Sequence, residues 1–343
     1  MNYKTASIAG LTLLAGLALA QDRGPGQAPA GPGPGRGFVN MDPVDPRVQL
    51  RTYVFADTGE TLPYAVFVPS SYSKSKKTPL VLALHGMNGS HRTFMRTACV
   101  DEAEKNGFLL VGPMGYSSTG SFGMVFSMGG RGRGPGGPGA PGGPGGPGAA
   151  PQANPNAPAP QAQQPPANPA APDQAARGRG PGPGPGRGMP EPGGTKETDR
   201  TKVAELSEKD SMNVLEMMRK EFNVDDNRIY LMGHSMGGGG ALHMGEKYAT
   251  IWAAVAGLAP AAFGFQWSAD SALKNVPLLI IQGDADTTVR PAGSQQLADQ
   301  LKGLGFQDEF KLLPGLDHGG IIAGSMPDVF QFFAAHTKAA PAR

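Results

Sequence analysis

Cysteine is nearly missing from this chain, whose 343 residues include only Cys99. A single cysteine excludes an internal disulfide, so an oxidising compartment would be permitted but not used for covalent stapling. Cys99 lies in the helical pattern "HRTFMRTACVDEAEKNG". We interpret it as a small buried hydrophobic residue in preference to a catalytic thiol.

The chain also has no large excess of positive or of negative charge. Lysine and arginine number 30 against 28 aspartates and glutamates, which leaves a net charge of +2. Such a balance predicts neither a nucleic acid nor an anionic membrane surface as a partner.

Long apolar runs are missing too, except in residues 1–20, "MNYKTASIAGLTLLAGLALA". Lys4 precedes an apolar run that ends in Ala-Leu-Ala, a pattern typical of a cleaved secretory signal with Gln21 as the new N-terminus. A membrane anchor is the alternative, for which this run is short. We therefore expect a secreted or periplasmic protein with no stable membrane insertion after cleavage.

Two segments, 21–46 and 129–194, are rich in glycine and proline, and the second is also rich in alanine. The heptapeptide "GPGPGRG" occurs once in each, at 31–37 and 182–188. Four glycine triplets at 136–147 are too few for a collagen helix. Because such a composition has little apolar surface to bury, we expect both segments to be disordered.

The remaining residues suit one domain, 47–340, interrupted by the insert 129–194. "VQLRTYVF" and "ETLPYAVFV" predict an antiparallel hairpin near its N-terminus. Short apolar runs then alternate with helical patterns. The runs are "PLVLALHG", "FLLVGP", "RIYLMG", "AAVAGLAP", "PLLIIQG" and "FKLLPG", and the helices are expected over 91–105, 205–222, 237–248, 291–304 and 326–338. This alternation predicts an α/β fold with a mostly parallel sheet covered on both faces.

Ligands of open parallel sheets gather at the carboxyl ends of the strands, so the residues after each strand matter most. "RIYLM" is followed by Gly233-His234-Ser235-Met236-Gly237, a G-x-S-x-G motif between a strand and a helix. In that context the serine occupies a tight, strained turn that exposes its hydroxyl. The alternative is a plain glycine turn with an idle serine.

The elbow motif runs into four consecutive glycines, 237–240, although each costs a helix about 1 kcal/mol relative to alanine. Gly237 fits the tight turn, and Gly238 would let the helix approach its neighbours. The motif gives no reason for Gly239 and Gly240 beyond close packing of the helix.

Two backbone N–H groups are candidates for an oxyanion hole. "PLVLAL" is followed by His85-Gly86-Met87, where a turn can point the Met87 N–H toward the same spot as the Met236 N–H. Such donors stabilise the charge that develops on an attacked carbonyl oxygen. We interpret His85 as a structural residue that holds this loop and not as the base.

The acid and base follow the last two predicted strands. "PLLIIQ" precedes "GDADTTV", which offers Asp284 and Asp286, and "FKLLPG" precedes "LDHGG", which offers His318. The order serine, aspartate, histidine is that of the α/β-hydrolase triad. The other five histidines are better explained by packing or solvent. Because the histidines lack ligand spacing, we expect no metal, and no cofactor is needed.

The motifs "PLVLALHGMNGS", "NRIYLMGHSMGG", "IIQGDADTTV" and "LDHGG" resemble those of secreted bacterial α/β-hydrolases of the esterase group. That group includes polyhydroxybutyrate depolymerase-like, feruloyl esterase-like and dienelactone hydrolase-like proteins. "GHSMGGGG" also resembles the elbow of bacterial cutinases, but paired C-terminal cysteines are missing here. The resemblance implies an α/β-hydrolase fold and a triad of Ser235, Asp286 and His318, because the acid of related hydrolases sits three residues after the glycine.

The implied reaction is acyl transfer through an acyl-enzyme, with a small-molecule or polymeric ester as the partner. "GHSMGG" is likewise similar to prolyl-oligopeptidase-type peptidases, so a peptidase or acyltransferase on the same triad stays open. A non-catalytic surface or binding protein is the third alternative. The aromatic residues that could contact substrate, or instead cap the core, are Tyr116, Phe122, Phe263, Phe265 and Trp267.

Overall fold

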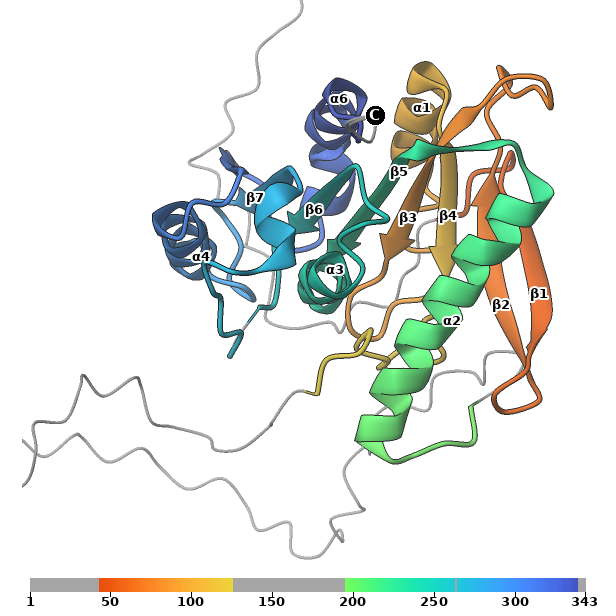
Figure 1. Cartoon of the computed structure of the whole chain (residues 1–343), viewed down its shortest axis with the longest axis horizontal. Coiled ribbons are helices and arrows are strands. Elements are labelled where there is room, and N and C mark those ends of the chain that lie inside the picture. The colour runs from red at the N-terminus through yellow and green to blue at the C-terminus, as the bar shows by residue number, and fades with distance from the viewer. Residues whose placement is uncertain (1–42, 126–194, 263, 339–343) are drawn as a thin grey trace, which may run out of the picture. The chain divides into compact units, whose positions relative to one another are not determined.

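A computed structural model describes residues 43–125, 195–262 and 264–338 (Figure 1). The predicted signal, nearly all of the segment 21–46, and the insert 129–194 lie outside the described residues. Within the described ranges, no helix is both long enough and apolar enough to span a membrane.

One sheet of eight strands forms the centre of the fold, in the order β1-β2-β4-β3-β5-β6-β7-β8. The strands are β1 Gln49–Phe55, β2 Glu60–Phe67, β3 Thr78–Leu84, β4 Leu109–Pro113, β5 Val224–His234, β6 Ala254–Leu258, β7 Leu278–Gly283 and β8 Asp308–Leu313. β1 and β2 form the predicted hairpin, and β2 is also antiparallel to β4. All other pairs are parallel, so the loops after β3, β5, β7 and β8 share one edge of the sheet.

Helices cover both faces of this sheet. They are α1 Thr97–Asn106, α2 Arg200–Glu221, α3 Met236–Lys247, α4 Pro291–Gly303, α5 Ile321–Gly324 and α6 Met326–Ala335, with a 3-10 turn η1 at Ala272–Asn275. In Figure 1, α1 and α6 lie on one side of the strands, and α2, α3 and α4 lie on the other. The short α5 was not expected from the sequence.

Local sequence explains where several helices begin and end. The Asp199 carboxylate accepts from the backbone N–H of Lys202 and caps α2. Gly107, at φ 70°, ends α1 in the left-handed conformation that glycine adopts without strain. Pro291 occupies the first turn of α4, where its missing N–H has no cost.

The first helix is shorter than predicted, because the expected range 91–105 is helical only from Thr97. The residues before it form tight turns, in which the Met95 N–H donates to Arg92. The Met95 carbonyl accepts the N–H of Asp45 instead of a bond from within a helix. A contact with the N-terminal segment therefore decides this boundary.

The core has two layers, divided by the sheet. On β3, Leu80, Leu82 and Leu84 pack into the cluster that includes Leu215 of α2, while Val81 and Ala83 pack into the cluster that includes α1 and α6. Successive side chains of a strand point to opposite faces, so a continuous apolar strand fills both layers. This rigid two-layer body holds the loops at the carboxyl edge of the sheet.

Candidate active site

Ser235 occupies a strained turn between β5 and α3. Its backbone has φ 55° and ψ −114°, a conformation that non-glycine residues rarely adopt. The Ser235 N–H donates to the Leu258 carbonyl at 2.9 Å, and the Ser235 carbonyl accepts from Ala261 at 2.9 Å. These bonds to the end of β6 and the loop beyond it hold the turn, as the strand–turn–helix motif predicted.

The four glycines after the elbow touch different neighbours. Replacing Gly237 by alanine would set the new methyl group 2.2 Å from the Leu84 carbonyl oxygen, and at Gly238 it would lie 2.9 Å from Pro260. At Gly239 the methyl group would lie 2.4 Å from the Ala261 oxygen, and at Gly240 it would lie 2.7 Å from Phe122. Real Cβ atoms do not approach this closely, so each position requires glycine unless its neighbour moves. Close approach of α3 to β3 and to two loops offsets the low helix propensity of this run.

The structure brings Ser235, His318 and Asp286 together from three separate loops. His318 Nε2 lies 3.0 Å from Ser235 Oγ, and His318 Nδ1 lies 2.8 Å from Asp286 Oδ2. Asp286 follows β7 and is 3% exposed, while His318 follows β8 and is 8% exposed. With Nδ1–H donated to the carboxylate, Nε2 can accept the serine proton.

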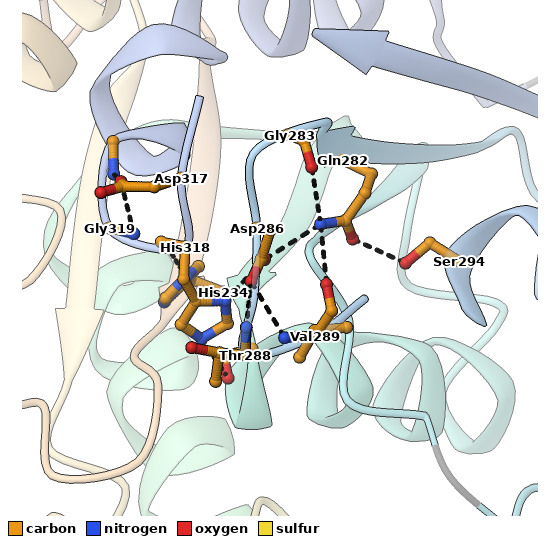
Figure 2. Close-up of polar contacts among 12 residues, drawn as sticks. His234, Gln282, Gly283, Asp286, Thr288, Val289, Ser294, Asp317, His318 and Gly319 are labelled. Atoms are coloured by element: carbon orange, nitrogen blue, oxygen red, sulfur yellow. Dashed lines mark hydrogen bonds and ion pairs between the residues drawn. The ribbon is translucent and has the colours of Figure 1, made fainter. Parts of the chain in front are cut away.

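Both oxygens of the Asp286 carboxylate are held (Figure 2). Oδ1 accepts the backbone N–H groups of Thr288 at 2.8 Å and Val289 at 3.0 Å. Oδ2 accepts the side-chain amide of Gln282 at 3.0 Å in addition to His318. Asp284 is exposed and accepts the Gly315 N–H at 2.6 Å, so it braces the turn after β8 and does not face His318.

His234, the variable residue of the elbow, supports His318. Its Nε2 lies 2.7 Å from the His318 carbonyl oxygen, and the two ring centroids are 4.6 Å apart. Burial, with a smaller effect from His318, lowers the pKa of His234 to about 3. The ring is therefore neutral at ordinary pH and donates to that carbonyl. From the sequence, His234 is interpreted as a packing or solvent-exposed residue, because the elbow motif carries no signal for this contact.

The turn that carries His318 is ordered by Asp317, a residue to which the sequence motifs assign no role. Asp317 Oδ1 accepts the N–H of Gly319 at 3.1 Å and that of Gly320 at 2.6 Å. An aspartate before a pair of glycines is a signal for this kind of local turn. The bond to Gly319 is drawn in Figure 2.

The predicted oxyanion loop lies against the elbow. A methyl group at Gly86 would lie 2.9 Å from the buried ring nitrogen Nδ1 of His234, so glycine at this position permits the close approach. Met236 is the first residue of α3, where N–H groups have no acceptor within the helix. Met87 is 54% exposed, and the N–H of the next residue, Asn88, donates to Ser118 at 2.7 Å.

His85 is placed as a structural residue. It is buried, with its ring nitrogens 2.7 Å from the Gly86 and Met114 carbonyl oxygens. Burial lowers its pKa. The ring thus ties the loop after β3 to the end of β4.

Of the two alternatives for Tyr116 and Phe122, substrate contact or packing in the core, their burial favours packing. Tyr116 is 1% exposed, and its hydroxyl donates to Glu60 at 2.6 Å. Phe122 is 0% exposed, with its ring edge-on to His85. Both residues lie in the loop after β4, which folds inward against α2 and α3, and this burial leaves no surface for a ligand.

Phe263 lies outside the described residues. The rings of Phe265 and Trp267 stack at 5.1 Å and line a pocket with His243 and Glu246. None of the three residues brought together at the elbow lines this pocket. In the described ranges, no three His, Cys, Asp or Glu side chains are grouped so as to hold a metal ion.

The chain is similar to known proteins both in sequence and in fold. Residues 197–301, which include Ser235 and Asp286 but not His318, match the model of the PETase family, described as PET hydrolase-like. No curated protein sequence is significantly similar to the chain.

Solved structures share the fold at low identity. A CE1 ferulic acid esterase from Anaeromyces mucronatus, in complex with ferulic acid, has 15% identity and a TM-score of 0.53, over 84% of this chain and 91% of that one. An S-formylglutathione hydrolase from Agrobacterium tumefaciens has 16% identity and a TM-score of 0.52, over 85% and 95%. A fluorophosphonate-binding serine hydrolase from Staphylococcus aureus has 13% identity and a TM-score of 0.51, over 84% and 98%. These likenesses confirm the expected fold: the chain has an α/β-hydrolase fold, and its residues 197–301 are similar to the PET hydrolase-like family.

Proposed function

We propose that the protein is a secreted serine hydrolase that cleaves carboxylic esters through an acyl-enzyme. The observation that carries this proposal is the hydrogen-bonded path from Ser235 Oγ through His318 to Asp286, at a strained elbow. The similarity of residues 197–301 to PET hydrolase-like proteins supports an ester substrate.

The reaction would proceed in two halves. Ser235 Oγ attacks the ester carbonyl carbon while His318 Nε2 takes the hydroxyl proton, and Asp286 steadies the resulting imidazolium. The N–H groups of Met87 and Met236 would stabilise the negative oxygen of the tetrahedral intermediate. His318 then gives the proton to the departing alcohol. A water molecule, activated by the same histidine, attacks the acyl-enzyme and releases the acid.

The alternatives on the same three residues are peptide hydrolysis and acyl transfer to another alcohol or amine. A panel of p-nitrophenyl esters, aminoacyl amides and acceptor alcohols, assayed with purified protein, separates these reactions. We expect turnover of esters, with amides far slower. Amide hydrolysis that matches or exceeds ester hydrolysis would replace the proposal with a peptidase.

The nucleophile is tested separately from the substrate. A serine-directed phosphonate should add its mass to the peptide that contains Ser235, and Ser235→Ala should abolish both labelling and ester turnover. Labelling at another serine, or full turnover in Ser235→Ala, contradicts the mechanism. Export is tested by sequencing the mature N-terminus, which we expect at Gln21.

A further inference from the structure

Gln282 stands out in β7 because it is the one polar side chain in a strand whose six residues are all buried. It is 0% exposed. A buried amide without partners costs about 2 to 7 kcal/mol, so its hydrogen bonds must be accounted for. Its side chain bonds Asp286, Ser294 of α4, and the backbone carbonyls of Gly283 and Val289.

The two ends of the Gln282 amide face chemically different partners (Figure 2). Nε2 donates to Asp286 Oδ2 at 3.0 Å and to the Val289 carbonyl oxygen at 3.1 Å. It also lies 3.3 Å from the carbonyl oxygen of Gly283, the next residue in the chain. Oε1 accepts the hydroxyl of the buried Ser294 at 2.7 Å. A flipped amide would set its oxygen against a carboxylate and two carbonyls, so only one orientation is stable.

This orientation bears on the geometry of the site. The backbone N–H groups of Thr288 and Val289 hold only Oδ1 of Asp286, which leaves the carboxylate able to pivot about that oxygen. Gln282 donates to Oδ2, the same oxygen that accepts from His318 Nδ1. The amide therefore fixes the oxygen that orients the imidazole.

We propose that Gln282, held by Ser294, is a positioning residue that keeps Asp286 Oδ2 aligned with His318. The inference rests on the proposed function, and it adds a role that neither the triad motif nor the elbow contains. Gln282 acts through Asp286 and touches no substrate.

The test measures kcat and KM for a p-nitrophenyl ester in Gln282→Met, which keeps the side-chain length but removes both polar ends. We expect kcat to fall by about tenfold to a hundredfold, as is typical when a residue that orients a reactive group is lost, with KM nearly unchanged. Gln295→Met is the matched control, because Gln295 is an exposed glutamine on α4 that bonds only Asp299. This control should retain wild-type kcat and KM.

A double-mutant cycle separates positioning from a general structural effect. In an Asp286→Asn background, Gln282→Met should lower kcat by no more than about twofold, because its route to the histidine is already broken. A loss in that background equal to the loss in wild type overturns the proposal. Wild-type kcat in Gln282→Met also overturns it.

Ser294→Ala provides a second, milder variant if Gln282→Met does not fold. Loss of the hydroxyl removes the donor to Oε1 and leaves the amide held at one end only. We therefore expect a severalfold fall in kcat that likewise disappears in the Asp286→Asn background. If Gln282→Met does not fold, an unchanged kcat in Ser294→Ala contradicts the proposal. A wild-type protein that neither cleaves esters nor is labelled at Ser235 overturns the proposed function as well, which distinguishes the two failures.

Discussion

At the scale of single residues, the two aspartates after β7 have different surroundings although they are two positions apart. Asp286 is buried and faces His318, whereas Asp284 is exposed and holds the Gly315 N–H. Asp286→Asn would present an amide to Nδ1 and favour the wrong tautomer, so we expect kcat to fall by about four orders of magnitude.

Asp284→Asn is the matched control, and we expect it to keep kcat within about threefold because surface changes have small effects. Ester kinetics of the two purified variants decide the point. A larger loss in Asp284→Asn than in Asp286→Asn would show that the geometry around His318 is misassigned.

Part of this site could be predicted from the sequence alone. A serine between two glycines, after a strand and before a helix, marks the elbow. The choice of Asp286 over Asp284 came from the resemblance to related hydrolases, since both carboxylates follow the same strand. Gln282 gave a faint signal as an amide in an apolar strand, but its partner Ser294 lies on the following helix, and only folding places the two together.

At the scale of elements, α3 begins with residues that disfavour a helix, and its packing explains them. Glycine to alanine in a helix normally gains about 1 kcal/mol. At Gly240 the added methyl group would lie 2.7 Å from the Cβ of Phe122, whose side chain is fully buried, so that its displacement would disturb the packing around it. We expect Gly240→Ala to lower the free energy of unfolding by about 1 to 3 kcal/mol through overpacking, measured by urea denaturation.

Gly293→Ala is the control for that substitution. Gly293 lies in α4 and a methyl group there would meet nothing within 4 Å. We expect this variant to be stabilised by about 0.4 to 1 kcal/mol. Stabilisation of both variants would mean that Phe122 yields, and that close packing does not account for the glycine run.

At the scale of the whole molecule, buried histidines make stability depend on pH. Burial lowers the pKa of His234 to about 3 and that of His91 to about 4, and it also lowers the pKa of His85. Below pH 6.5 the unfolded chain binds protons that the folded protein does not, so stability is lost as the pH falls from about 6.5 toward 4. Asp210 opposes this between about pH 6 and 4, because burial raises its pKa to about 6.

We expect the free energy of unfolding to be lower at pH 5 than at pH 7.5, by up to about 2 kcal/mol for each histidine that stays neutral at pH 5 when folded. Urea denaturation at the two pH values measures this difference. His91→Gln removes one buried titrating group, and the Nδ1 of His91 has no hydrogen-bond partner to lose. We therefore expect the stability of this variant to depend less steeply on pH than that of the wild-type protein. Greater stability of the wild-type protein at pH 5 would contradict the sign of the effect.

The two ends that flank the insert are held by the folded body itself. The Gly123 N–H donates to Ala204 at 2.9 Å, and the Lys196 N–H donates to the buried Glu60 at 2.7 Å. Replacing residues 129–194 with a short Gly-Ser loop lowers the cost of loop closure by about 2 kcal/mol. We expect the melting temperature to hold or rise slightly, with small-ester turnover kept.

Calorimetry and p-nitrophenyl ester kinetics of the shortened chain check this expectation, against the full-length protein. Failure to fold, or a loss of turnover beyond about tenfold, would mean that the insert is part of the enzyme. A fall in activity on polymeric substrates alone would assign it a role in reaching bulky esters.

The amino-acid sequence alone determined the helices and strands, their alternation, and the loops that carry Ser235, Asp286 and His318, because hydrophobic periodicity and glycine motifs are local signals. Tertiary structure decided what depends on neighbours distant in sequence. Burial of the loop after β4 decided between the two alternatives left open for Tyr116 and Phe122, in favour of packing. Contact between α3 and two loops made Gly239 and Gly240 necessary. Such requirements arise only when segments far apart in the sequence meet at van der Waals distance, and a local pattern carries no record of that meeting.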